Sequence, residues 1–254
     1  MPVIVTVPCL ADNYAFLLHD PATGATACID VPEAAPILAV LDARGWTLGD
    51  VILTHHHSDH VDGLPDLLAR APARVWGATA DAHRLPPLDH AVAAGDTIPI
   101  GTLTGHVIDV PGHTIGHIAV HVPDAGAVFT ADSLMALGCG RLFEGTPDQM
   151  WESLSKLAAL PPETLICSGH EYTASNAKFA LTIEPDNPDL ISRVQAIGRA
   201  RATGQATVPS TLATELATNP FLRSHLPAVK SAIGMADAPD ARVFAAIRAA
   251  KDRF

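Results

Sequence analysis

The segment Thr54-His55-His56-His57-Ser58-Asp59-His60 holds the densest group of side chains that could do chemistry. Imidazole nitrogens and carboxylate oxygens are common ligands of Zn, Fe and Mn ions in proteins. The apolar run Val51-Ile52-Leu53 comes directly before it, which predicts a short buried strand that ends where the ligands begin. The alternative is a histidine-rich surface turn that binds nothing, and residues elsewhere in the chain must decide between the two.

The spacing within this segment suits two neighbouring ions. If the backbone stays extended through His57, alternation places His55 and His57 on one face and His56 on the other. Asp59 and His60 follow the turn and can approach from a second side. One segment can therefore supply His55 and His57 to one ion, and Asp59 and His60 to another.

Three further predicted strands end in the same kind of side chain. His113 follows an apolar run and a Pro-Gly turn, Asp132 follows residues 128–130, and His170 follows residues 165–167. Each of them alone has a simpler interpretation as a turn or cap residue. Functional groups on layered α/β folds gather at strand ends, so the repetition indicates a site.

These residues divide into two ligand sets that share one carboxylate. His55, His57 and His113 would hold one ion, Asp59, His60 and His170 would hold the other, and Asp132 would bridge both. Two cations about 3.5–4 Å apart can share a hydroxide and polarise a substrate carbonyl, and Asp59 would also orient that hydroxide. We therefore expect two divalent ions per chain. Nitrogen and oxygen ligands fit zinc, iron or manganese alike, so these residues do not choose among the metals, of which zinc is the one we expect. His56 and His117 are expected to support the ligands or pack against them.

The size and charge of the chain exclude several classes of protein. It has 254 residues, of which 48% are hydrophobic, and a formal net charge of −11. This acidic balance argues against non-specific binding to nucleic acid or to an anionic membrane surface, although a local basic patch stays possible. No apolar stretch is long enough to cross a bilayer. A monomer is expected.

The four cysteines are widely spaced and form no Cys-x-x-Cys pair. In a chain of this length, Cys9, Cys28, Cys139 and Cys167 predict buried reduced thiols rather than a disulfide framework. The first seven residues lack the features of a secretory signal and have the pattern of a strand. The expected location is the cytoplasm.

Two kinds of pattern divide the chain near residue 172. Before it, short β-like runs alternate with helical patterns, which indicates layered α/β packing. The predicted strands are 2–7, 14–18, 26–30, 51–54, 74–76, 103–110, 117–122, 126–130 and 164–167, and the predicted helices are 33–44, 61–70 and 147–159. After it, only helical spacing remains, at 173–183, 188–202, 211–217 and 239–251. We expect an α/β catalytic domain over 1–172 and a small all-helical domain over 173–254.

With these residues in place, the chain resembles the metallo-β-lactamase superfamily, and within it the glyoxalase II (hydroxyacylglutathione hydrolase) family. The superfamily resemblance lies in the His-x-His-x-Asp-His segment and in the three later ligands. The narrower resemblance lies in residues 138–146, 169–173, 208–223 and 248–254. It implies an αββα sandwich for the first domain and a substrate-binding role for the helical domain.

The resemblance also implies a set of contacts to glutathione. These would come from Arg141, Phe143, Tyr172, Arg248 and Lys251. Arg248 and Lys251 are three residues apart on a predicted helix, so they share a face and could bracket a carboxylate.

Two positions depart from the family pattern. Phe143 stands where the family often has tyrosine, which would remove a hydroxyl contact to glutathione. Ala131-Asp132-Ser133 replaces the more usual Gly-Asp-Thr, which should leave the ligand intact.

The implied reaction is hydrolysis of S-(2-hydroxyacyl)glutathione, with S-D-lactoylglutathione giving glutathione and D-lactate, the second step of methylglyoxal detoxification. A thioester suits a metal-hydroxide site without a general acid, because a thiol with a pKa of about 8.5 leaves as thiolate. One alternative is an iron-dependent persulfide dioxygenase on the same fold, against which the complete second ligand set and the long helical region argue. The others are a non-enzymatic metal-binding protein, against which the seven-ligand set argues, and a lactonase, which would have no use for the basic residues.

Overall fold

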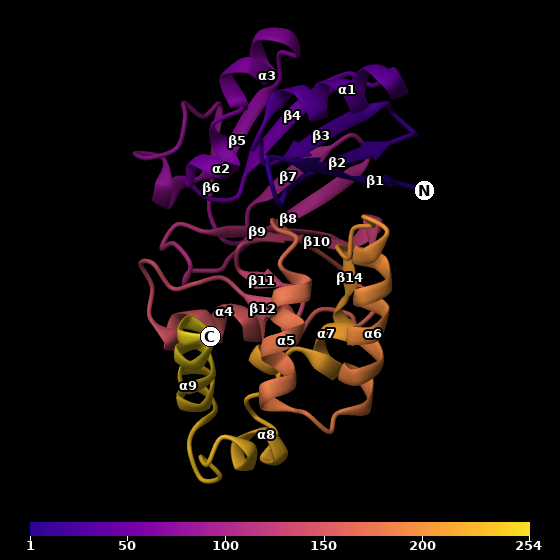
Figure 1. The fold of residues 1–254 in the computed structure, drawn as a ribbon. Coiled ribbons are helices and arrows are strands. Elements are labelled where there is room, and N and C mark those ends of the chain that lie inside the picture. The colour runs from indigo at the N-terminus through magenta and orange to yellow at the C-terminus, as the bar shows by residue number, and fades with distance from the viewer. The chain divides into compact units, whose positions relative to one another are not determined.

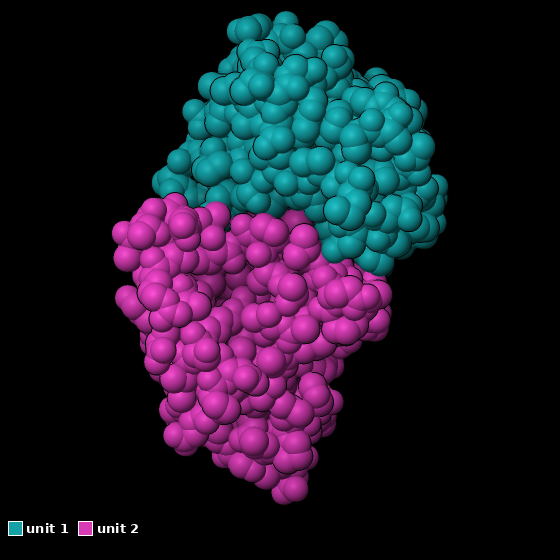
Figure 2. Space-filling model, turned by 90° about the vertical axis from the view of Figure 1, so that its right-hand side faces the viewer, with its two compact units in different colours: residues 1–109, 115–131 teal, residues 110–114, 132–254 magenta.

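The computed structural model describes all residues from 1 to 254, and the chain gathers into two compact units. Unit 1 comprises residues 1–109 and 115–131, and unit 2 comprises residues 110–114 and 132–254 (Figure 2). The sequence predicts a domain boundary between residues 172 and 173, which does not coincide with the division into these two units. That boundary stays a prediction.

A six-stranded sheet forms the first part of unit 1 (Figure 1). Its strands follow chain order, with β1, β2 and β3 antiparallel and β3 to β6 parallel. They are β1 (Val3–Cys9), β2 (Asn13–Asp20), β3 (Ala25–Ile29), β4 (Leu48–Leu53), β5 (Arg74–Ala78) and β6 (His90–Val92). Because β3 to β5 run parallel, the residues that follow β3 and β4 come out at the same edge of the sheet.

Three helices accompany this sheet, namely α1 (Ala34–Arg44), α2 (Ser58–Val61) and α3 (Leu64–Arg70). Apolar residues of α1 and α3 join those of the strands in one buried core. The prediction of one helix over 61–70 was wrong in extent, because the chain forms α2 and α3 on either side of Gly63. A Cβ atom at Gly63 would lie 2.8 Å from the Cα atom of Glu33, so only glycine allows this close approach.

The remaining strands of unit 1 pair antiparallel in chain order. They are β7 (Thr97–Ile100), β8 (Leu103–Asp109), β9 (Ile118–Val122) and β10 (Ala127–Ala131), and the 3₁₀ turns of this unit are η1 (Thr79–Asp81) and η2 (Pro123–Ala125). The amide of Ile118 donates to the carbonyl of Thr54 at 3.0 Å, so the start of β9 is tied to the segment that leaves β4.

Unit 2 is mainly helical. Its strands form two short pairs, β11 (Leu134–Met135) with β12 (Gly138–Cys139), and β13 (Leu165–Ser168) with β14 (Ser210–Thr211). Its helices are α4 (Pro147–Ala158), α5 (Thr173–Ile183), α6 (Pro188–Ala202), α7 (Leu212–Thr218), η3 (Pro220–Leu222), α8 (Pro227–Ala232) and α9 (Asp240–Arg253). Buried residues of α5 and α6 pack together around Leu137.

Prolines begin several of these helices, including one that the sequence analysis did not predict. Pro147 and Pro188 stand at the first position of α4 and α6, after the capping side chains of Thr146 and Asn187. Pro227 likewise begins α8, for which no helix was predicted. The short strands β6, β7, β11, β12 and β14 were also missed.

The interleaved strands and helices, followed by C-terminal helices, confirm the expected fold class. No helix is both long and apolar enough to span a membrane.

All four cysteines are free and buried, as the sequence predicts. Burial raises the pKa of the Cys9 and Cys139 thiols to about 11, and it also raises the pKa of Cys28 and Cys167. Because the thiolate is the reactive form, the folded protein at pH 8 should resist alkylation by iodoacetamide. Mass spectrometry should find unmodified protein before denaturation and all four thiols modified afterwards. Rapid modification in the folded state would contradict this.

Candidate metal centre

Unit 1 brings three predicted ligands together where β4 ends. The ring centroid of His55 lies 4.8 Å from that of His57 and 4.3 Å from that of His60. His55 and His60 are completely buried, whereas His57 and Asp59 are partly exposed. Asp59 and His60 lie on α2, directly after the turn. Imidazole rings that are buried this close together need hydrogen-bond partners that fix which ring nitrogens carry protons, or a cation that they bind in common.

Asp30 sets that pattern of protonation. Its Oδ2 atom accepts from the Thr54 hydroxyl at 2.8 Å and lies 2.8 Å from His60 Nδ1. Because the hydroxyl proton of Thr54 goes to Asp30, its oxygen accepts from His55 Nδ1, at 3.0 Å. In their neutral form, His55 and His60 then carry the lone pair on Nε2, as metal-binding imidazoles do.

The sequence analysis missed Asp30, although a signal for it was present. Asp30 follows β3 as Asp132 follows β10, so the same criterion of an acidic residue at a strand end would have found it. One donor atom each from Asp30, His55 and His60 lie within 4.8 Å of one another.

His56 and His117 lie against this group. The Nδ1 atom of His56 is 3.0 Å from the buried carboxylate of Asp81, which also pairs with Arg84. His117 is stacked on His55, with ring centroids 4.6 Å apart, and its Nδ1 atom donates to the carbonyl of Ile118 at 3.1 Å. These contacts agree with the packing roles expected from the sequence.

Unit 2 brings its own three predicted ligands together. The Oδ2 atom of Asp132 lies 3.4 Å from His113 Nε2 and 3.3 Å from His170 Nε2. The Nδ1 atom of His113 donates to the carbonyl of Arg141 at 2.8 Å, so Nε2 of the neutral ring carries the lone pair. Two imidazole nitrogens that face one buried carboxylate form a nitrogen and oxygen donor set that fits a divalent cation.

The backbone around these ligands is tightly constrained. Gly112 has a φ of 152°, and a Cβ atom there would lie 2.8 Å from Met150, so glycine is required just before His113. Ala131 has a φ of 40°, a left-handed conformation that costs a non-glycine residue energy. This strained residue stands directly before Asp132. The family that the chain resembles usually has glycine at this position.

Three of the predicted substrate residues form a basic group in unit 2. Arg248 is only 6% exposed and donates to the carbonyl of Cys139 at 2.9 Å and to Asp252 Oδ1 at 2.9 Å. Arg141 lies 3.4 Å from the same Asp252 oxygen. Asp252, which the sequence analysis overlooked, therefore links two of the predicted basic contacts.

Lys251 lies beside two aromatic rings. Its Nζ atom is 5.3 Å from the ring centroids of both Phe179 and Phe254. Burial, together with the nearby charge of Arg248, lowers the pKa of Lys251 from its ordinary value. Lys251 therefore loses its positive charge at a lower pH than an exposed lysine does.

The two predicted aromatic contacts each lie against a predicted ligand. Tyr172 is stacked on His170 with centroids 4.6 Å apart, and Phe143 meets the ring of His113 edge-on at 5.3 Å. Phe143 is 61% exposed.

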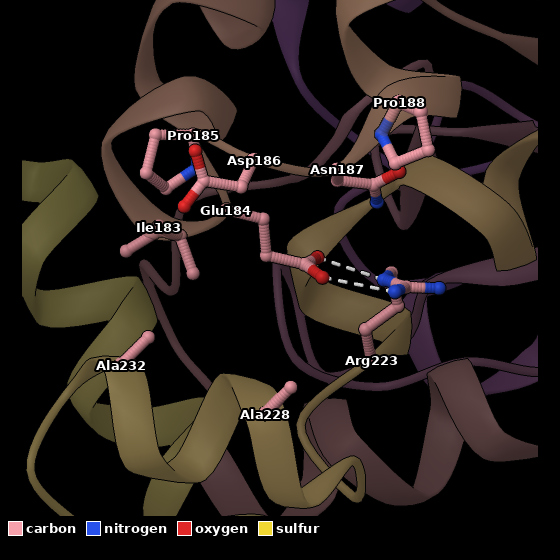
Figure 3. Close-up of a pocket in the computed structure, with 9 residues that line it drawn as sticks. All are labelled: Ile183, Glu184, Pro185, Asp186, Asn187, Pro188, Arg223, Ala228 and Ala232. Carbon is pink, nitrogen blue, oxygen red and sulfur yellow. Dashed lines mark hydrogen bonds and ion pairs between the residues drawn. The ribbon is translucent and has the colours of Figure 1, made fainter.

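A cavity of about 360 Å³ elsewhere in unit 2 holds none of the predicted site residues (Figure 3). Its lining includes apolar and proline side chains beside the polar ones of Glu184, Asp186, Asn187 and Arg223. Glu184 and Arg223 pair with each other through two hydrogen bonds of 2.7 Å and 2.9 Å, as Figure 3 shows. These two charges therefore satisfy each other.

Two family models together match most of the chain. The metallo-beta-lactamase superfamily model matches residues 17–170, and the model described as hydroxyacylglutathione hydrolase C-terminus matches residues 171–254.

Individual relatives agree with these matches. A hydroxyacylglutathione hydrolase from Jannaschia sp. (strain CCS1) is 71% identical over 253 residues, which is 100% of this chain and 99% of the relative. Among solved structures, ETHE1 from Myxococcus xanthus has 25% identity and a TM-score of 0.67 over 97% of this chain and 90% of its own. TTHA1623 in a di-iron-bound form has 26% identity and a TM-score of 0.57 over 67% of this chain and 91% of its own.

Proposed function

Because the chain belongs to the hydroxyacylglutathione hydrolase family of the metallo-β-lactamase superfamily, we propose that it hydrolyses S-(2-hydroxyacyl)glutathione to glutathione and a 2-hydroxy acid. S-D-lactoylglutathione, which gives D-lactate in the second step of methylglyoxal detoxification, is the proposed substrate. The observation that carries this proposal is the full-length identity of 71% to a hydroxyacylglutathione hydrolase.

The chain's predicted ligands are proposed to hold two divalent ions. The ligands are His55, His57, Asp59 and His60 of unit 1, with His113, Asp132 and His170 of unit 2. The Nδ1 atoms of His60, His55 and His113 are hydrogen-bonded to Asp30, Thr54 and the Arg141 carbonyl, respectively. In neutral rings this leaves the lone pair on Nε2, where it can bind an ion, which supports the proposal. When bound, such ions lower the pKa of a water molecule toward 7 and polarise a carbonyl group. Zinc is the proposed metal, and the di-iron form of TTHA1623 keeps iron as an alternative.

The chain's own residues then bind and orient the substrate. Water attacks the thioester carbonyl, the carbon–sulfur bond breaks, and glutathione leaves as a thiolate that needs little protonation near neutral pH. Asp59 and Asp132 are proposed to orient the attacking water. Domain 173–254 is proposed to bind glutathione through Arg248 and Lys251, with Arg141, Phe143 and Tyr172 from the preceding segment. These basic side chains offset the acidity of the chain where a dianionic substrate must dock.

One assay tests the proposal against its main alternative. The purified protein is supplied with S-D-lactoylglutathione, and the release of free thiol is followed, while metal content is measured on the same sample. Thiol release supports the proposal. Oxygen uptake with glutathione persulfide and no thioester hydrolysis would instead support a persulfide dioxygenase, and inactivity in both assays would favour a non-enzymatic metal-binding protein. Cytoplasmic location and a monomeric state stay predictions.

Lys251→Ala is expected to raise the KM for S-D-lactoylglutathione about tenfold and to lower kcat less than twofold. The reason is that Lys251 would contact glutathione equally in the ground state and the transition state. The depressed pKa of Lys251 further predicts that the KM of the unmodified chain rises with pH below the ordinary lysine range. Arg253→Ala removes an exposed charge from the same helix and should leave KM unchanged. An unchanged KM in Lys251→Ala would remove Lys251 from the binding site.

A further inference from the structure

Asn13 makes two hydrogen bonds to one of the predicted ligands. Its Nδ2 atom lies 3.0 Å from the main-chain oxygen of Asp59 and 3.0 Å from Asp59 Oδ2. A primary amide has two hydrogens on this nitrogen, so both bonds can form at once. The side chain of Asp59 is 41% exposed, whereas Asn13 is only 5% exposed. The buried amide therefore restrains the rotation of a partly exposed carboxylate.

The chain holds Asn13 firmly in this place. Asn13 is the first residue of β2 and is paired across the β1–β2 hairpin with Cys9. In the connecting turn, Leu10 has a φ of 49°, a conformation that leucine rarely adopts. The Leu10 amide donates to a carboxylate oxygen of Glu33 at 3.1 Å, which anchors this strained turn.

The same anchor reaches the helix that carries Asp59. Glu33 precedes α1, and its backbone lies against Gly63, just after α2. The amide of Val31 donates to the carbonyl of His60 at 2.8 Å, and the amide of Gly63 donates to the carbonyl of Val31 at 3.0 Å. The hairpin turn and α2 are thus fixed to one short segment, residues 31–33. This explains why the side-chain amide of Asn13 is held within hydrogen-bond distance of Asp59.

We infer that Asn13 is a positioning residue, which fixes the rotation of the Asp59 carboxylate relative to the imidazole of His60, whose Nε2 atom lies 3.8 Å from Asp59 Oδ2. Oδ2 of Asp59 accepts one hydrogen bond from the Asn13 amide. The second hydrogen bond, to the main-chain carbonyl of Asp59, holds the amide in place, so rotation of the carboxylate would break the first bond. Residues that orient a metal ligand in this way commonly contribute about 10- to 100-fold to metal affinity. The inference rests on the proposed metal centre, because it gives Asp59 the role of a ligand.

The test measures metal affinity by chelator competition in Asn13→Asp and Asn13→Leu. Asn13→Asp has nearly the same shape but lacks the amide donors. Asn176→Leu is the matched control, because Asn176 is also buried and its amide donates to a main-chain carbonyl, that of Ala136, at 3.0 Å. We expect both Asn13 variants to lose one ion per chain about 10- to 100-fold more readily than the unmodified protein. The second ion should stay, kcat should fall, and KM should change less than twofold.

Separate results overturn the inference and the proposed function. If the unmodified protein holds two ions and both Asn13 variants hold them equally well, only the inference is wrong. If the Asn13 variants lose both ions together, and their thermal stability falls more than that of Asn176→Leu, the role of Asn13 is structural and the inference is also wrong. If the unmodified protein binds no ion whose retention depends on Asp59, the proposed metal centre itself is wrong.

Discussion

Replacing Asp132 by alanine is expected to lower kcat/KM for S-D-lactoylglutathione by about 10³-fold or more and to reduce the metal content of the purified protein. Asp132 is the residue of unit 2 on which both His113 and His170 converge, at 3.4 Å and 3.3 Å from its Oδ2 atom. Without the carboxylate, two buried imidazoles would face each other with no anion to share a cation between them. No carboxylate would then offset the repulsion between two bound cations, so at least one ion should be lost.

The measurement combines steady-state kinetics with elemental analysis of the same preparation. Asp124→Ala is a suitable control, because it removes one exposed aspartate from the turn η2 and has no ligand beside it. It should leave both metal content and activity within twofold of the unmodified protein. Full activity in metal-depleted Asp132→Ala protein would end the proposal of a two-ion centre.

The strand ends that carry the candidate ligands could be predicted from the sequence. The run before His55 is short, apolar and β-branched, and its burial in β4 follows from that composition. The same holds for the runs before Asp132 and His170, which form β10 and β13. A short apolar run identifies such a strand because the strand buries these side chains in the core, regardless of which other elements pack against it.

Apart from Asp30, which follows a strand, the residues that support the ligands could not be predicted in the same way. Asn13 and Asp81 are 46 and 25 residues away in sequence from the groups that they contact. Each is a single polar residue, with no spacing that distinguishes it from a turn or cap residue. Their roles come from tertiary proximity, which no local pattern in the sequence encodes.

Glu215 shows how a similar support extends to the C-terminal helices. It is completely buried on α7 and accepts hydrogen bonds from Arg193, from Ser210, and from the backbone amide of Leu137 at 2.8 Å. Asn219 donates to it at 3.1 Å and also to the carbonyl oxygens of Met135 and Gly138, each at 3.0 Å. The β11–β12 hairpin, which begins two residues after Asp132, is therefore fixed to α7 through one buried carboxylate.

Glu215→Leu is accordingly expected to lower the free energy of unfolding by about 3–5 kcal/mol, measured by urea denaturation. The substitution leaves the guanidinium of Arg193, 10% exposed, without its buried counter-charge and leaves the amide of Leu137 without an acceptor. Adding Arg193→Met to Glu215→Leu should recover part of the loss, because an apolar pair leaves no buried charge unbalanced. Glu152→Ala, which breaks the exposed pair with Lys156, should cost less than about 1 kcal/mol. A loss in Glu215→Leu no larger than that of Glu152→Ala would show that the network does not hold the hairpin. A double variant less stable than Glu215→Leu alone would show that the unbalanced charge of Arg193 is not the cause.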